Sequence, residues 1–174
     1  MRTDDFRVGI GYDIHRLSEG RRLILGGIEI AHPKGLIGHT DGDAVLHAVT
    51  DALLGAAGLP DIGDLFPDTD PAYKDADSRV LLADAVERVR TRGFRAGNVD
   101  VIVHAEAPKL SAYKAQIAES IARLVGLAPQ DVSVKAKTNE GLGPLGHEDA
   151  IACTAIASVV RMVDCERTAK ANRQ

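Results

Sequence analysis

The sequence has little of several residue types, and each shortage excludes a class of protein. Among 174 residues there is no Trp, aromatic residues make up only 3%, and there are two Cys. No apolar run reaches the roughly 18 residues that a membrane-spanning helix needs. The formal net charge is −4, without the basic patch that a nucleic-acid-binding surface requires. We therefore expect neither a membrane protein nor a nucleic-acid-binding protein.

What is present indicates one globular domain. Hydrophobic residues make up 45% of the chain, and a core must be built from Val, Ile, Leu and Ala. The length suffices for one domain with a substantial core. The first five residues lack the apolar segment of a signal peptide, and Cys153 and Cys165 lack metal or redox spacing. These features predict a cytoplasmic protein with reduced thiols.

The most informative stretch is residues 38–47, Gly-His-Thr-Asp-Gly-Asp-Ala-Val-Leu-His. Thr40 is a candidate N-cap, and Asp43 could complete a capping-box-like pair with it. Apolar residues then recur at helical spacing until the sequence Gly-Leu-Pro at residues 58–60. This pattern predicts a helix with His47 one turn inside it and Asp43 on the same face. Asp41 is simply a first-turn carboxylate in this interpretation.

A candidate strand precedes that helix at residues 7–15, where apolar side chains alternate with others. Asp13 and His15 are two residues apart and so project from one face. If the strand end meets the helix start, both converge with His47. Two histidines and one carboxylate are a ligand set for zinc with the fourth position open. The alternative is that each is an ordinary, partly buried polar residue.

Further along the chain, strand and helix patterns alternate. Residues 21–30 predict a hairpin around Gly26-Gly27, and residues 31–36 a loop. Helices are expected at 78–92, with Ser78 as the cap, and at 111–125, and strands at 98–104 and 130–137. Residues 151–163 fit helix and strand equally well. A long acidic loop at 61–77 is either a solvated surface loop or a functional one.

These elements predict one α+β domain, a mixed sheet with helices on one face. Its core spans about residues 7–163, and residues 164–174 form a polar tail. The uncovered sheet face is a candidate for self-association.

Four motifs together resemble the 2-C-methyl-D-erythritol 2,4-cyclodiphosphate synthase family. They occur in order at residues 11–15, 38–43, 61–71 and 107–109, and the similarity runs from about residue 7 to about residue 163. The resemblance implies that residues 151–163 form a strand and that the chain forms a homotrimer packed through its sheets, with sites between subunits. It also implies the cyclisation of 4-diphosphocytidyl-2-C-methyl-D-erythritol 2-phosphate with release of CMP, in the non-mevalonate isoprenoid pathway.

The resemblance also implies roles for individual residues. Asp13, His15 and His47 would bind one zinc per chain, whose fourth ligand is a substrate phosphate oxygen. His39 and Thr40 would contact phosphate and the diol, His39 with a catalytic role, and Asp43 would orient a zinc histidine. The acidic loop would contact the methylerythritol part through the following residues: Asp61, Ile62, Gly63, Phe66, Asp68 and Asp70.

The cytidine half of the site would come from two further segments. The cytosine pocket would use Ala105, Ala107, Pro108, Lys109 and Leu110. Phosphate contacts would come from Lys137, from Thr138, which is assigned a catalytic role, and from Glu140, which would hold magnesium or manganese on the diphosphate. At Pro144 and His147 the chain departs from the family pattern of Phe and Arg, which leaves their substrate contacts open.

Two other functions fit parts of this pattern. A zinc-dependent phosphoesterase would use the same ligand set with a zinc-bound water, although no general base is evident beside the metal. A trimeric protein that binds a metal or an isoprenoid phosphate without catalysis is the second alternative. Analysis of the phosphorus-containing products separates all three.

Overall fold

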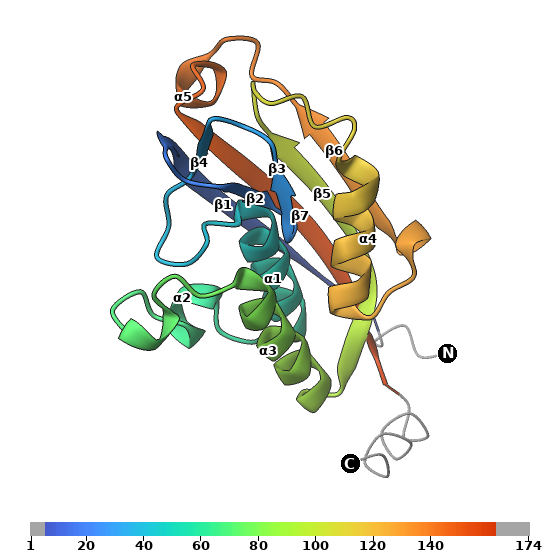
Figure 1. Ribbon diagram of the computed structural model, residues 1–174. Helices are drawn as coiled ribbons and strands as arrows, with labels where there is room; N and C mark the ends of the chain where they lie inside the picture. The colour runs from blue at the N-terminus through green and yellow to red at the C-terminus, as the bar shows by residue number, and fades with distance from the viewer. Residues whose placement is uncertain (1–5, 163–174) are drawn as a thin grey trace.

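The computed structural model describes residues 6–162, which form one α+β unit around a five-stranded sheet. The strand order is β4-β1-β7-β5-β6, and β2 and β3 form a separate hairpin (Figure 1). Only β5 and β6 run parallel; the other neighbours in the large sheet are antiparallel. The predicted mixed sheet is thus confirmed. The predicted polar tail, residues 164–174, lies outside the described residues.

The strands and helices have the following bounds. The strands are β1 (Phe6–Glu19), β2 (Leu23–Leu25), β3 (Ile28–Ile30), β4 (Lys34–Leu36), β5 (Phe94–His104), β6 (Val132–Lys137) and β7 (Ala150–Arg161). The α-helices are α1 (Ala44–Ala57), α2 (Ile62–Leu65), α3 (Ser78–Thr91), α4 (Lys114–Val125) and α5 (Gly143–Gly146). Two single 3₁₀ turns, η2 (Pro71–Tyr73) and η3 (Pro129–Asp131), complete the described elements.

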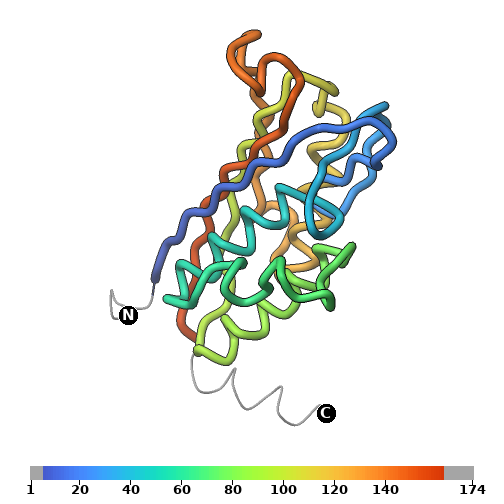
Figure 2. The backbone as a smooth tube through the Cα atoms, turned by 90° about the vertical axis from the view of Figure 1, so that its left-hand side faces the viewer, coloured from blue at the N-terminus to red at the C-terminus, as the bar shows by residue number. Residues whose placement is uncertain are grey.

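The long helices lie on one face of the sheet, as predicted. Helix α1 packs on β1 and β7, α4 packs beside β6, and α3 lies against α1 (Figures 1 and 2). The core between these layers is aliphatic, with Phe94 as its one fully buried aromatic side chain among the described residues. The last strand, β7, resolves the ambiguity of residues 151–161, because it pairs on both sides, with β1 and with β5, while Val163 lies outside the described residues.

Helix α1 lies unusually close to β1 because two glycines face it. A Cβ added at Gly9 would lie 2.1 Å from the carbonyl oxygen of Ala52, and one added at Gly11 would lie 2.0 Å from that of Ala48. No real Cβ fits at such distances, so only glycine permits this approach. The close contact holds the start of α1 over the middle of β1, where the candidate ligands lie, and β1 continues to Glu19, beyond its predicted end at residue 15.

Several local predictions were wrong. Helix α1 is capped by Asp43 rather than Thr40, and α3 by Asp77 rather than Ser78. Part of the predicted 31–36 loop is β4, which pairs with β1. Short helical turns, α2 and η2, interrupt the acidic loop that we expected to be irregular. Helix α4 begins at Lys114, three residues after its predicted start.

The sheet face opposite the helices carries an apolar stripe along β1. Every second residue of this strand has an exposed side chain: Phe6, Val8, Ile10, Tyr12 and Ile14. Ile156 on β7 pairs with Ile10 and extends the stripe. Among residues 6–162, no helix is long and apolar enough to cross a membrane.

Candidate metal centre and active site

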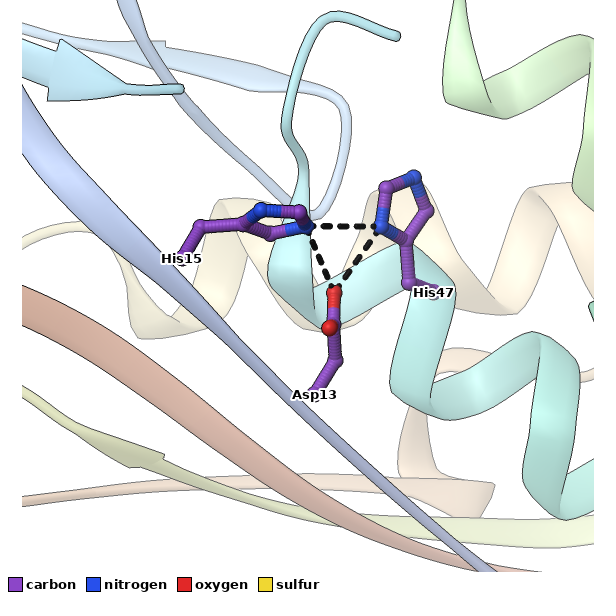
Figure 3. A group of neighbouring side chains, drawn as sticks. All are labelled: Asp13, His15 and His47. Carbon is purple, nitrogen blue, oxygen red and sulfur yellow. Dashed lines mark hydrogen bonds and ion pairs between the residues drawn. The ribbon is translucent and has the colours of Figure 1, made fainter. Parts of the chain in front are cut away.

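Asp13, His15 and His47 converge on one point, as predicted. The first two come from β1 and the third from the first turn of α1, and their side chains point toward one another (Figure 3). Asp13 Oδ2 lies 2.9 Å from His15 Nε2 and 2.9 Å from His47 Nδ1, and the two ring nitrogens are 3.2 Å apart. Within the described residues this is the one such cluster of three metal-ligating side chains.

The donor set fits a tetrahedral zinc ion. Ligand atoms about 2.0–2.2 Å from zinc at tetrahedral angles lie roughly 3.3 Å from one another. The three observed separations are slightly shorter than this value, so a small outward movement of the side chains would admit the ion. Two nitrogens and one carboxylate oxygen leave the fourth position open, as in zinc sites that act on a bound group.

The charges in the cluster are strongly coupled. Burial alone would raise the pKa of Asp13, but hydrogen bonds from His15 and His47 and their positive charge outweigh it and hold this pKa well below its ordinary value. Burial would likewise lower the pKa of His15, but the hydrogen bond and charge of Asp13 raise it above its ordinary value. The carboxylate is therefore negative and attracts cations.

Each imidazole is also held by its surroundings. The backbone of Ile37 lies near the His15 ring and helps to raise the pKa of His15. His47 turns its other nitrogen, Nε2, toward Ser78 Oγ at 2.9 Å and Thr40 Oγ1 at 3.1 Å. Ser78 was predicted only as a helix cap, and no local pattern indicates that it reaches a residue 31 positions earlier. Thr40 is buried, and its side chain lies behind His47.

Asp43 does not orient a zinc histidine through its side chain, contrary to our expectation. Its carboxylate accepts hydrogen bonds from four backbone N–H groups, those of Gly26, Gly27, Val45 and Leu46. Burial, assisted by the charge of Asp41, raises the pKa of Asp43 to about 6, although the hydrogen bonds from Gly26, Gly27 and Leu46 favour the charged form. Asp43 therefore links the β2–β3 hairpin to the first turn of α1.

The acidic loop is anchored beside the metal cluster. His39 Nε2 lies 3.3 Å from the carbonyl oxygen of Asp70, and the backbone N–H of Asp75 donates to the carbonyl of His39 at 2.7 Å. Phe66 packs edge-on against Tyr73 at 5.5 Å and helps to hold the loop in shape. His39 and Asp70, two predicted site residues, are thus brought together.

Sequence reasoning missed Asp51, which lies on α1 one turn after His47. It accepts a hydrogen bond from the backbone N–H of Ile62 at 2.8 Å and so positions the predicted contacts Asp61, Ile62 and Gly63. Burial raises the pKa of Asp51, assisted by the nearby charges of Asp61 and Asp13. The sequence did contain a signal for Asp51, since it is a carboxylate on an otherwise apolar helix, four residues after the candidate metal ligand His47.

The predicted cytosine pocket lies at the ends of β5 and β6. Ala105 and Leu110 are buried, Ala107 and Pro108 are half-buried, and Lys109 is exposed. The segment is joined to the end of β6, since the N–H of Ala105 donates to the carbonyl of Lys137 at 2.9 Å. The structure therefore brings the two predicted cytidine segments together.

The last residue of β6 and the residues after it are exposed. Lys137, Thr138 and Glu140 all face solvent, and Thr138 Oγ1 donates to Glu140 Oε1 at 3.1 Å. Glu106, which was not predicted as a site residue, accepts from the N–H of Asn139 at 3.1 Å and links the two segments. Its acidic side chain within the 105–110 loop was the only sequence signal.

Pro144 and His147 are also exposed, at the beginning and end of α5. Figure 1 shows α5 at the top of the molecule and α2, in the acidic loop, at the lower left. One chain therefore does not bring the acidic loop and the α5 segment together.

Comparison with known proteins agrees with this geometry. A sequence model of the YgbB family matches residues 6–160. The chain belongs to the YgbB family. A 2-C-methyl-D-erythritol 2,4-cyclodiphosphate synthase from Bordetella petrii is 57% identical over 156 residues, which cover 90% of this chain and 96% of that protein. The enzyme of the same name from Dechloromonas aromatica is 56% identical over 158 residues, 91% and 99% of the two chains.

Solved structures with the YgbB-family fold include complexes with a cytidine nucleotide. The IspF–CDP complex of Plasmodium falciparum superposes with a TM-score of 0.80 at 34% identity, covering 92% of this chain and 99% of that one. A CDP-bound 2C-methyl-D-erythritol-2,4-cyclodiphosphate synthase gives a TM-score of 0.81 at 40% identity, covering 88% and 99%.

Proposed function

We infer that this chain is a 2-C-methyl-D-erythritol 2,4-cyclodiphosphate synthase of the non-mevalonate isoprenoid pathway. The observation that carries this is the cluster of Asp13, His15 and His47 in a chain 57% identical over 156 residues to an enzyme of that name. The substrate is 4-diphosphocytidyl-2-C-methyl-D-erythritol 2-phosphate. An oxygen of its 2-phosphate attacks the β-phosphorus, and the bond from that phosphorus to the α-phosphate oxygen breaks. CMP leaves with that oxygen, and the cyclic diphosphate remains.

The three clustered residues would hold zinc, with a phosphate oxygen of the substrate as fourth ligand. When bound, zinc supplies Lewis-acid polarisation of that phosphate and a template that orients it. Asp13 supplies the negative charge that attracts the cation, and His15 and His47 supply two neutral nitrogen ligands. Zinc is supported by the two nitrogen donors and one carboxylate oxygen, and by distances between these three atoms that are close to those of a tetrahedral zinc site.

The attacking phosphate and the diol would lie between the metal and the acidic loop. His39 would donate to a phosphate oxygen as negative charge shifts, and the backbone of Thr40 would meet the same group. Hydroxyls of the methylerythritol would contact the backbone and carboxylates of the acidic loop, because a polyol offers hydroxyl donors. These contacts involve the residues listed earlier for that loop, Asp61, Ile62, Gly63, Phe66, Asp68 and Asp70.

The cytidine diphosphate would bind at the ends of β5 and β6. The backbone of residues 105–110 would read the cytosine, with Lys109 adding positive charge. Lys137 and Thr138 would contact phosphate, and Glu140 would help to hold magnesium or manganese on the diphosphate. Pro144 and His147 follow these cytidine-binding segments in the chain. His147 offers one ring N–H donor where an arginine would offer a planar, charged guanidinium group.

A cyclic homotrimer would unite the two halves. The exposed apolar stripe on β1, from Phe6 to Ile14, is the kind of surface that a second subunit covers. Packing three sheets around an axis would bury this stripe and bring the acidic loop of one subunit to the cytidine segments of its neighbour. In such a ring each of the three junctions holds one complete site.

Product analysis tests the activity directly. The purified protein is incubated with the diphosphocytidyl substrate, zinc and magnesium, and the mixture is followed by phosphorus NMR. Formation of the cyclic diphosphate with an equal amount of CMP is the expected result. A linear hydrolysis product would instead establish the zinc-dependent phosphoesterase alternative, and unchanged substrate would contradict any enzymatic role.

A further inference from the structure

The structure contains a chain of buried hydrogen bonds behind His47 that the proposed reaction does not use. Ser78, the first residue of α3, is 1% exposed, and its Oγ lies 2.9 Å from His47 Nε2. The same hydroxyl makes a short hydrogen bond to Asp41 Oδ1. The chain therefore runs from a carboxylate, through a hydroxyl, to the ring nitrogen that faces away from the metal cluster.

The chemistry of these three groups determines where the protons lie. An ionised carboxylate only accepts hydrogen bonds, and a serine hydroxyl has a single proton to donate. The proton of Ser78 is therefore directed to Asp41, and a lone pair of its oxygen faces His47 Nε2. That lone pair can accept from His47 Nε2, which keeps its proton when Nδ1 holds a metal ion. Thr40 Oγ1, at 3.1 Å, can accept from the same N–H group.

The carboxylate at the end of the chain is itself held in place. Asp41 Oδ2 accepts from the backbone N–H of Ser78 at 3.2 Å, and Oδ1 accepts from that of Asp43 at 3.2 Å. The backbone N–H of Asp41 donates to the carbonyl of Ala76 at 3.0 Å. Ser78 is also free of a capping task, because Asp77 caps α3. The start of α3 thus holds the hydroxyl against the imidazole.

We propose that Ser78, held by Asp41, accepts the Nε2–H of His47 and so orients the ring with Nδ1 toward the metal. Both act as positioning residues, since Ser78 contacts only the nitrogen of His47 that faces away from the metal position and Asp41 acts through Ser78. The proposal deepens the zinc site proposed above and rests on it. It also explains why the two histidines use different nitrogens: His15 faces the cluster through Nε2, whereas His47 faces it through Nδ1.

The first test locates the proton in the metal-free protein. Two-bond ¹H–¹⁵N correlation spectra of labelled histidines are recorded at a pH of about 8.5, two units above the ordinary histidine pKa of about 6.5. Asp13 Oδ2, which lies 2.9 Å from Nδ1, also attracts the proton, so we expect His47 Nε2 to carry it in part of the wild-type population. In Asp41→Asn the new amide can donate to Ser78, which frees the hydroxyl proton to turn toward His47, so part of the population should lose the Nε2 proton.

The second test measures zinc affinity by competition with a chelator. Ser78→Ala and Asp41→Asn should each bind zinc about 10- to 100-fold more weakly, the usual effect of losing a group that orients a metal ligand. The matched control is Ser120→Ala, since Ser120 is also a helical serine at 1% exposure and its hydroxyl has no hydrogen-bond partner among the described residues. The control should change zinc affinity less than about twofold.

These outcomes separate the two proposals. A wild-type protein that binds no zinc would overturn the metal centre. A wild type that binds zinc but lacks the proton on His47 Nε2, or variants at Asp41 and Ser78 that bind zinc as tightly as the control, would overturn the role of this hydrogen-bond chain alone.

Discussion

The metal half of the site and the cytidine half differ in how much one chain supplies. Asp13, His15 and His47 lie on a long strand and a long helix, and partners outside the cluster hold both imidazoles. Lys137, Thr138 and Glu140 lie at the end of β6 and in the exposed segment after it, with mostly local contacts. The proposed metal half is preorganised within one chain, whereas the proposed cytidine half is exposed, as expected of a half that a neighbouring subunit would complete.

The largest effect is expected from removing one ligand of the metal half. His47→Ala should abolish stoichiometric zinc binding and lower turnover by about 10³-fold, because a bound metal contributes several kcal/mol to transition-state stabilisation. Elemental analysis and a steady-state assay measure both. His32→Ala, outside the cluster, is the control and should keep its zinc. Undiminished zinc in the His47 variant would mean that the three residues are not the ligand set.

The preorganisation of the metal half can be tested without substituting a metal-binding residue. In Gly11→Ala the new methyl group would collide with the carbonyl of Ala48, so α1 must move away from β1. We expect the free energy of unfolding to fall by about 1–3 kcal/mol and zinc binding to weaken. Urea denaturation and chelator competition are the measurements.

Gly55→Ala is the matched control on the same helix. Nothing lies within 4 Å of the Cβ it would gain, so this variant should be more stable by about 0.5–1 kcal/mol, with unchanged zinc affinity. Equal effects of the two substitutions would show that the close contact between α1 and β1 does not matter.

A smaller effect is expected in the cytidine half. Thr138→Ala removes one neutral hydrogen-bond donor, and its contact is proposed to strengthen as charge shifts in the transition state. Turnover should fall about tenfold, which corresponds to an increase of roughly 1.4 kcal/mol in the activation free energy. CMP affinity should change less than about twofold. If CMP affinity collapses and turnover does not change, Thr138 is a ground-state nucleotide contact.

Features encoded by neighbouring residues could be predicted from the sequence. Gly58 ends α1 in a left-handed conformation, and Gly26 and Gly27 form the hairpin turn, because glycine adopts positive φ without strain. The metal ligands were also predictable, since the spacing of Asp13 and His15 on a strand and the place of His47 on a helix fix their directions.

Features set by distant contacts could not be predicted. Thr40, Asp41 and Asp43 are all suitable helix caps, and the choice of Asp43 reflects the N–H groups of a hairpin 16 and 17 residues earlier. Likewise Lys34–Leu36 has no strong strand pattern and becomes β4 by pairing with β1. The contact of Ser78 with His47 depends on how α3 packs beside α1, which no local pattern encodes.

The shared site is the central claim, and complementation between two impaired variants tests it most directly. His47→Ala lacks an intact metal half, and a more severe change than Ala at the other position, Thr138→Glu, which places a negative charge beside the phosphate, lacks an intact cytidine half. The two are denatured, mixed equally and reassembled, and native mass spectrometry confirms mixed rings. Each mixed trimer has one junction where two intact halves meet, so random assembly should restore about a quarter of wild-type activity. Mixed rings with no more activity than the parent variants would show that each chain holds a complete site and would contradict this account.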